Sequence, residues 1–122
     1  MHVTDYGVTV CVREPGRFHA TKSAIEFLSV SFGWIRRFRS ETELKSQLKR
    51  AAMCITLNVA EGAGKNRRDD RARFFIIARG FAMECAAIID VCKIAELISD
   101  DEAKAAKQLL VRIVSMLTNM AR

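Results

Sequence analysis

The sequence predicts an all-α fold, an antiparallel up-down four-helix bundle. Apolar residues recur at intervals of three and four along most of the chain, which is the period of an amphipathic helix. A single proline and six glycines provide too few turns for a β-rich fold. At 122 residues the chain has the size of one domain, so its helices share one core, and short connections between them favour antiparallel neighbours.

Residues 1–17 are expected to form an N-terminal arm, and residues 18–122 the bundle. Valines alternate with other residues between positions 8 and 12, which is typical of a short edge strand, and Pro15 follows soon after. Two interpretations of the arm stay open, a loose segment and a short strand.

Two helices are expected over about Ala20–Phe38 and from Ser40 to Gly62. The second begins with a capping-box pattern, in which Ser40 and Glu43 would satisfy free backbone N–H groups. Its apolar residues step by four, three, four and four and form one stripe, and Gly62 and Gly64 then stop the helix. The stripe consists of Leu44, Leu48, Ala51, Ile55 and Val59.

The third helix is expected from about Asp69 to Ile98 and is apolar on more than one side. Between Ala78 and Ser99 only five residues are charged. A helix of this kind must bury more than one side. Neighbours within a small bundle cover only part of it, which predicts a subunit interface. The alternative is a central helix that its own neighbours cover completely.

A fourth helix is expected after Ser99, which begins a second capping pattern that ends at Glu102. Its apolar residues repeat by three and four, the spacing of a heptad, and predict the inner face of the helix. They are Ala103, Ala106, Leu110, Ile113, Leu117 and Met120.

The formal net charge is +6, and basic residues concentrate between Arg36 and Arg79, where twelve Lys or Arg stand against five Asp or Glu. Most of the twelve are arginines, whose planar guanidinium suits phosphate. A concentrated basic surface favours RNA or DNA as a partner; the alternative is a solvated face that only keeps the protein soluble. The candidate nucleic-acid-binding residues are Lys65, Arg67, Arg68, Arg71 and Arg73 around the connection after the second helix, together with Lys45 and Lys49.

No cluster of residues predicts a catalytic or metal site, so we expect a protein that is not an enzyme and needs no cofactor. The only histidines are His2 and His19, and neither belongs to a Glu-x-x-His motif. The run Gly62 to Lys65 lacks the preceding strand and the following hydroxyl residue of a phosphate-binding loop. The four cysteines form no Cys-x-x-Cys pair and are expected to be small buried hydrophobic residues, with a redox role as the alternative.

The sequence also indicates the cellular compartment of the protein. It has no apolar run of the ~18 residues that span a bilayer, and its start lacks the basic and apolar segments of a signal peptide. We therefore expect a cytoplasmic protein without membrane contact.

One stretch, Gln47 to Gly62, closely resembles the signature of the four-helix-bundle family of proteins encoded in intervening sequences of bacterial large-subunit ribosomal RNA genes. Its Arg-Ala-Ala step and its Asn-x-Ala-Glu-Gly ending match best. Further on, Phe74 to Gly80 and then Glu84 resemble the next block of that family. The chain departs from the family at positions where serine or proline is usual, and the changes make this helix pair more apolar.

The resemblance implies a ring-like homopentamer with no established enzymatic activity. The chain is also similar, more distantly, to the accessory variability proteins of diversity-generating retroelements, which are basic pentameric barrels that bind a reverse transcriptase and nucleic acid. The matching residues are Arg50, Asn58, Glu61, Gly62 and Gly80. We expect Asn58 and Glu61 to bond to backbone or to an arginine such as Arg50. Gly62 would stop its helix, and Gly80 would mark a close approach of two helices.

Two functions follow from these observations. The first is an oligomeric nucleic-acid-binding accessory protein that serves a reverse transcriptase or a ribosomal RNA element. The sequence has one tryptophan, Trp34, and one tyrosine, Tyr6, so we expect no aromatic platform on which bases could stack. The protein would then contact the backbone phosphates of the nucleic acid. The second is a structural or adaptor oligomer that receives another protein on its third helix and basic rim.

Overall fold

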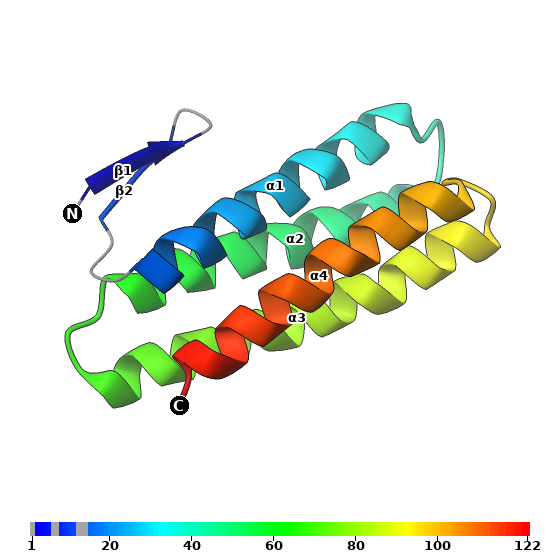
Figure 1. Ribbon diagram of the computed structural model, residues 1–122. Helices are drawn as coiled ribbons and strands as arrows, with labels where there is room; N and C mark the ends of the chain where they lie inside the picture. The colour runs from blue at the N-terminus through cyan, green and yellow to red at the C-terminus, as the bar shows by residue number, and fades with distance from the viewer. Residues whose placement is uncertain (1, 6–7, 12–14) are drawn as a thin grey trace.

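The computed structural model describes the backbone of residues 2–5, 8–11 and 15–122, and the side chains from residue 19 onward. Four long helices dominate the chain, and a short strand pair precedes them (Figure 1). The elements in chain order are β1 (His2–Asp5), β2 (Val8–Cys11), α1 (Pro15–Arg37), α2 (Thr42–Ala63), α3 (Arg68–Ile94) and α4 (Asp100–Met120).

The helices form an antiparallel up-down bundle, as the sequence predicts. Each helix packs on two others, so that α1 lies against α2 and α4, and α3 lies against α2 and α4. One end of the bundle holds the α1–α2 and α3–α4 connections, and the other end holds the α2–α3 connection and the C-terminus (Figure 1). Within the described part of the chain, no helix is long and apolar enough to cross a membrane.

The N-terminal arm contains an antiparallel hairpin in which β1 pairs with β2. His2 lies opposite Cys11, and Asp5 lies opposite Val8. The last valine of the predicted alternation, at position 12, lies outside the described residues.

The first helix begins at Pro15, five residues before the predicted start at Ala20. Proline fits the first turn of a helix because its missing N–H would have no partner there and its φ is already helical. The sequence predicts that Pro15 ends the arm, whereas in the structure it begins α1.

The predicted capping box at Ser40 and Glu43 is wrong. The N-cap residue of α2 is Glu41, which has a left-handed conformation with φ 61° and makes no side-chain capping bond. The Ser40 hydroxyl donates to the Glu41 carboxylate instead, at 3.2 Å. The helix α2 therefore begins after a tight turn that follows Phe38, and no side chain caps it.

The third helix ends at Ile94, four residues before the predicted Ile98. A Schellman turn ends it: the N–H of Glu96 donates to the carbonyl of Lys93 at 3.0 Å, and the N–H of Leu97 donates to the carbonyl of Cys92 at 2.9 Å. Glu96 has φ 59°, a conformation that usually requires glycine or asparagine, which is why the sequence did not reveal this stop.

The predicted cap of α4 is confirmed. The Ser99 hydroxyl accepts from the N–H of Glu102 at 3.1 Å, and the Glu102 carboxylate accepts from the N–H of Ser99 at 2.9 Å. The two bonds form a reciprocal capping box.

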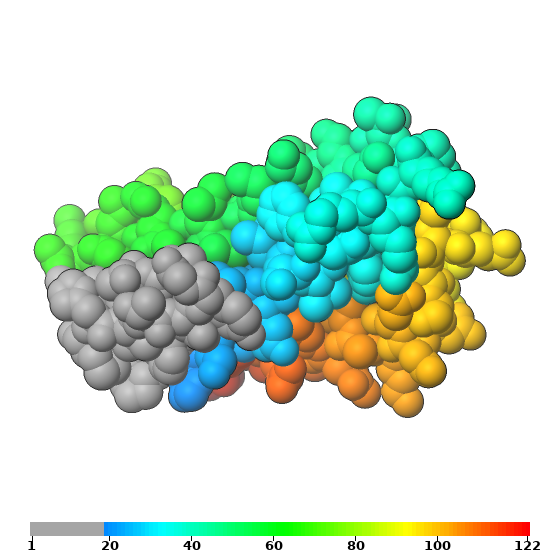
Figure 2. Space-filling model, turned by 90° about the horizontal axis from the view of Figure 1, so that it is seen from above, coloured from blue at the N-terminus to red at the C-terminus, as the bar shows by residue number. Residues whose placement is uncertain are grey.

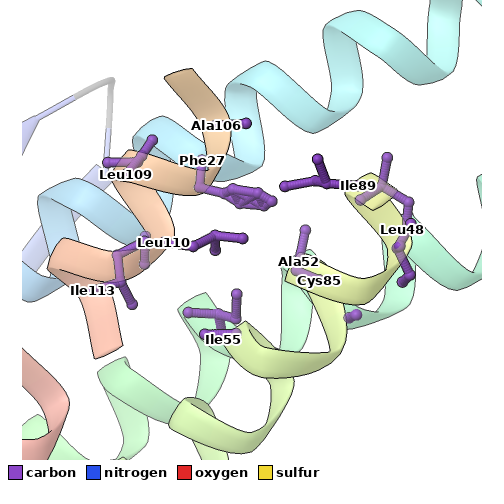
Figure 3. Packing of buried hydrophobic residues seen from close by; sticks show 14 of the residues in the cluster. Phe27, Leu48, Ala52, Ile55, Cys85, Ile89, Ala106, Leu109, Leu110 and Ile113 are labelled. Carbon is purple, nitrogen blue, oxygen red and sulfur yellow. The ribbon is translucent and has the colours of Figure 1, made fainter. Parts of the chain in front are cut away.

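The core lies where the predicted stripes of α2 and α4 face each other and the inner faces of α1 and α3 (Figure 3). Phe27, Ile55, Ile89 and Ile113 contribute one fully buried side chain from each helix. Most of the predicted stripe residues are buried, because helical periodicity places them on one side of each helix.

Candidate nucleic-acid interface

Five of the seven predicted binding residues lie together at the α2–α3 connection, beside the C-terminal end of α4 (Figure 1). We call them the α2–α3 basic cluster. Asp69 and Asp70 lie among them, so the connection has a local excess of three positive charges. The cluster consists of Lys65, Arg67, Arg68, Arg71 and Arg73.

Lys45 and Lys49 do not belong to this cluster. They lie in the first half of α2, 18 and 14 residues before its end at Ala63. At 1.5 Å per residue, these positions are about 27 Å and 21 Å from the end of the helix. The seven candidate residues are therefore divided between the two ends of α2, because this helix is 22 residues long.

Two cations of the cluster share one aromatic ring. The ammonium of Lys65 lies 5.4 Å from the centre of the Phe74 ring, and the guanidinium of Arg73 lies 5.1 Å from it. Lys65 also pairs with Glu61 at 3.1 Å. Cation–π contacts of this kind hold both cations near the α3 surface while leaving their charge exposed to solvent.

Two further arginines of the cluster bond to main-chain oxygens. The Nε of Arg68 donates to the main-chain oxygen of Arg122 at 2.9 Å, and Nη1 of Arg71 donates to the carbonyl of Asn66 at 2.6 Å. The Arg67 side chain is exposed and, within the described part of the chain, makes no hydrogen bond or ion pair. No carboxylate neutralises Arg67 or Arg71 among these contacts, so their charge remains available to an anion.

The residues of the predicted signature have structural partners, though not all the expected ones. Asn58 donates to the carbonyl of Cys54 at 2.8 Å, which confirms the prediction of a backbone bond. Arg50 pairs with Glu84 on α3 at 2.7 Å and lies 5.7 Å from the Phe81 ring centre. Arg50 therefore links α2 to α3, and the expectation that it bonds Asn58 or Glu61 is wrong.

The two signature glycines have roles that differ from those predicted. The helix ends at Ala63 with Gly64 as its C-cap residue, so the stop predicted at Gly64 is confirmed, whereas Gly62 still lies inside α2. A Cβ at Gly62 would lie 2.6 Å from Cε1 of Phe75. Gly62 therefore allows the close approach of α2 and α3. At Gly80 a Cβ would meet nothing within 4 Å, so the predicted close helix contact is wrong within the chain.

Gly80 belongs to an exposed apolar line along α3, which we call the α3 stripe. Its large members are strongly exposed, with Met83 at 60% and Ile94 at 82%. The interpretation of α3 as a helix fully covered by its own neighbours is thus wrong. The stripe is spaced by three and four residues, as on one side of a helix, and consists of Ile76, Gly80, Met83, Ala87, Val91 and Ile94.

Beside the stripe, α3 and α4 enclose a mainly apolar groove of about 340 Å³. Met83 and Ala86 line it from α3, and Leu110, Val111 and Val114 line it from α4. Val111 is itself 64% exposed, so the apolar surface continues from α3 onto α4.

Two of the three described thiols, Cys85 and Cys92, are buried and unreactive. Burial, with smaller electrostatic contributions led by Glu84, raises the pKa of Cys85 to about 12, and burial also raises the pKa of Cys92. Both behave as buried hydrophobic residues, as predicted, while Cys54 is half-buried. Among the residues that the structure describes, no group of three His, Cys, Asp or Glu side chains is placed to hold a metal ion.

Together these features define a small antiparallel four-helix-bundle protein with cations concentrated at one helix connection and an uncovered apolar helix face. A family model described as 23S rRNA-intervening sequence protein matches residues 17–119. The chain belongs to this family, which confirms the resemblance seen in its sequence.

A solved structure has the same fold. It is a protein of unknown function from the S23 ribosomal protein family of Bacteroides thetaiotaomicron, with a TM-score of 0.79 and 16% sequence identity. The match covers 87% of this chain and 97% of that one. A comparison with curated proteins finds no match.

Proposed function

We propose that this protein is a non-enzymatic, oligomeric nucleic-acid-binding protein that contacts RNA or DNA through the α2–α3 basic cluster. The observation that carries the proposal is the number of cations there that no carboxylate neutralises. Arg71 bonds only to a carbonyl oxygen, and the Arg67 side chain has no partner within the described residues. Cations left exposed and unpaired at one place attract phosphate groups.

The contacts would be made to backbone phosphates and sugars, which carry no sequence information directly. Arg68 and Arg71 are already oriented by hydrogen bonds to main-chain oxygens, so ordering them on a phosphate costs less side-chain entropy. The family to which the chain belongs is named for a ribosomal RNA element, which supports RNA as one ligand. A role as accessory to that element or to a reverse transcriptase is part of this proposal.

The α3 stripe supports the oligomeric part of the proposal. Water would contact a line of apolar side chains along most of α3 in a monomer, and soluble proteins rarely expose such a surface unless it is an interface. In an oligomer the basic cluster would be repeated around one particle, which raises its avidity for a polyanion.

A fluorescence-anisotropy titration with labelled RNA and DNA tests the binding. We expect binding at about 50 mM salt that weakens steeply toward about 200 mM, because bound phosphates release counterions. Arg67→Glu should weaken it, whereas Lys104→Glu, the same charge change at an exposed residue of α4, should have little effect. Absence of binding at low salt would refute the proposal.

A second candidate function is an adaptor that receives another protein. The apolar groove between α3 and α4 favours it, because an amphipathic helix fits such a surface. Co-purification of a protein partner in a fixed ratio, lost in Val111→Glu and accompanied by no nucleic-acid binding, would support this function in place of the first.

A further inference from the structure

We infer that the nucleic acid bound by this protein is a duplex that lies along α2 and contacts a basic cluster at each end of that helix. The inference rests on the proposed function and specifies its ligand. Its two supports are the distribution of unpaired cations along α2 and the absence of an exposed Phe, Tyr or Trp ring among the described side chains.

A second group of cations lies at the other end of α2, around the α1–α2 connection. We call it the α1–α2 basic cluster. Lys45 donates to the carbonyl of Phe38 at 3.3 Å, a bond that leaves its charge unneutralised. The other members are exposed and, within the described part of the chain, have no ion-pair partner. The cluster consists of Arg36, Arg39, Lys45 and Lys49.

Two arginines near this cluster form ion pairs with glutamates and are not members of it. Glu102 neutralises Arg37 at 2.7 Å, and Glu84 neutralises Arg50 at 2.7 Å. From Ala51 to Ala60 α2 carries no charged residue. Positive charge that is free to bind an anion is thus divided between the two ends of α2, with a neutral stretch between them.

The spacing of the clusters matches the repeat of a duplex. Lys45 and Lys49 lie about 27 Å and 21 Å from the end of α2 by the helical rise, and the extended side chains at both ends add several ångströms. One helical turn of B-form DNA is about 34 Å. Figure 2 shows both ends of α2 on the same face of the molecule, one end in teal and the other in green. A single duplex can therefore place phosphates of successive turns on the two clusters.

The aromatic side chains argue against a single strand. Proteins that bind single strands without sequence preference stack bases on exposed aromatic rings. The large hydrophobic residues that are exposed among the described side chains are all aliphatic or methionine. Trp34 and Phe38 are buried at 5% exposure, and the Phe74 ring is occupied by Lys65 and Arg73. The surface therefore offers phosphate contacts without a platform for unpaired bases.

Anisotropy titrations with labelled duplexes of about 8 and about 16 base pairs test the inference, because only the longer one exceeds a helical turn of about 10 base pairs. RNA and DNA duplexes and single strands of the same lengths are compared. Lys49→Glu removes charge from one cluster and Arg67→Glu from the other, and Lys104→Glu is the control with the same charge change. Circular dichroism checks that each variant is folded.

A long duplex offers more overlapping binding positions than a short one, and this gain is the same for every variant. The readout is therefore the ratio of the affinities for the long and short duplexes, which is measured for each variant and compared between variants. We expect the ratio to fall roughly tenfold in both Lys49→Glu and Arg67→Glu relative to the wild type and Lys104→Glu, since one of two linked contacts is lost. The long duplex should also bind more tightly than its single strand.

Other results would overturn the inference. If Arg67→Glu weakens binding but Lys49→Glu leaves the ratio unchanged, the proposed function stands and the two-cluster duplex site is wrong. Tighter binding of the single strand would also contradict it. If no nucleic acid binds at low salt, the proposed function fails as well.

Discussion

Arg37 at the end of α1 forms a two-pronged ion pair with Glu102 in the first turn of α4. Nη1 lies 2.7 Å from Oε2, and Nη2 lies 3.1 Å from Oε1. Nη2 also donates to the carbonyl of Leu97 at 3.0 Å, while Glu102 accepts from the N–H of Ser99. One carboxylate thus caps α4 and connects it to α1, at the end of the bundle where two connections meet.

The pair makes stability depend on pH. The hydrogen bond from Arg37, followed by the one from the N–H of Ser99, lowers the pKa of Glu102 from its usual 4.5 to about 2. Because the folded state binds the proton more weakly than the unfolded state, the stabilisation is complete above pH about 5 and is lost as the pH falls toward 2. Solvent screening at this partly exposed pair limits the effect to about 1 kcal/mol.

Urea unfolding at several pH values between 6 and 2.5 measures this dependence. In Glu102→Gln, which still accepts a bond at the cap but carries no charge, the free energy of unfolding should fall less over the same interval. Equal pH dependence in the variant and the wild type would contradict the assignment to Glu102.

Replacing glycine by alanine should have opposite effects at two helical positions. Gly62→Ala places a Cβ 2.6 Å from the Phe75 ring, and we expect a loss of about 1–3 kcal/mol from overpacking. Gly33→Ala places its Cβ in open space, so the better helix propensity of alanine should stabilise by about 0.5–1 kcal/mol. Thermal unfolding of both variants measures the difference, and a loss at both positions would contradict this account.

The turn between α3 and α4 contains a strained residue that glycine should relieve. Glu96 has φ 59°, which costs a residue with a Cβ roughly 1–2 kcal/mol. Glu96→Gly should therefore raise the free energy of unfolding by roughly 1 kcal/mol. Ala95→Gly is the matched control, because Ala95 has φ −76° and glycine there only loosens the chain. A destabilised Glu96→Gly would show that the Glu96 side chain contributes more than its backbone strain costs.

The cysteines should differ in reactivity. With the pKa of Cys85 at about 12, only about one thiol in ten thousand is ionised at pH 8, and the thiolate is the form that reacts. In a Cys11→Ser background, iodoacetamide should label half-buried Cys54 in the folded protein. Cys85 and Cys92 should be labelled only after unfolding. Mass spectrometry of the digested protein distinguishes these sites, and labelling of Cys85 as fast as Cys54 would contradict the burial.

The α3 stripe predicts that the protein is an oligomer in solution. Light scattering should give a multiple of the chain mass of 13.7 kDa. Met83→Lys, at a side chain already 60% exposed within the chain, should leave the fold intact and shift the mass toward that of one chain. Ser29→Lys, which adds the same charge on an exposed part of α1, is the control. A monomeric wild-type protein would refute the interface.

Most of the bundle is predictable from local pattern. The stripes of α2 and α4 and the capping box at Ser99 follow from residues three and four apart, which helical geometry brings to one side of one turn. The errors lie at helix ends. Pro15 and Ser40 are ambiguous as local signals, and the stop at Glu96 has no glycine to indicate it.

The candidate interface was predictable only in part. Neighbouring positions such as Arg67, Arg68 and Arg71 must lie together whatever the fold, so the sequence alone identifies the α2–α3 basic cluster. Lys49 is distant from it because of the length of α2, and the partner of Arg50 is Glu84 because of the register of α2 on α3. Neither register nor the pairing of cations can be derived from one helix alone.

The four helices, their buried faces, the family and the cations of the α2–α3 connection can all be inferred from the sequence, since each depends on residues close together in the chain. Which cations are neutralised, that Gly62 meets Phe75 while Gly80 meets nothing, and that the α3 stripe is uncovered follow only from the packing of the helices. Those facts depend on how four helices face one another. Packing between elements far apart in sequence sets that arrangement, and it determines which charges and apolar residues remain available to a partner.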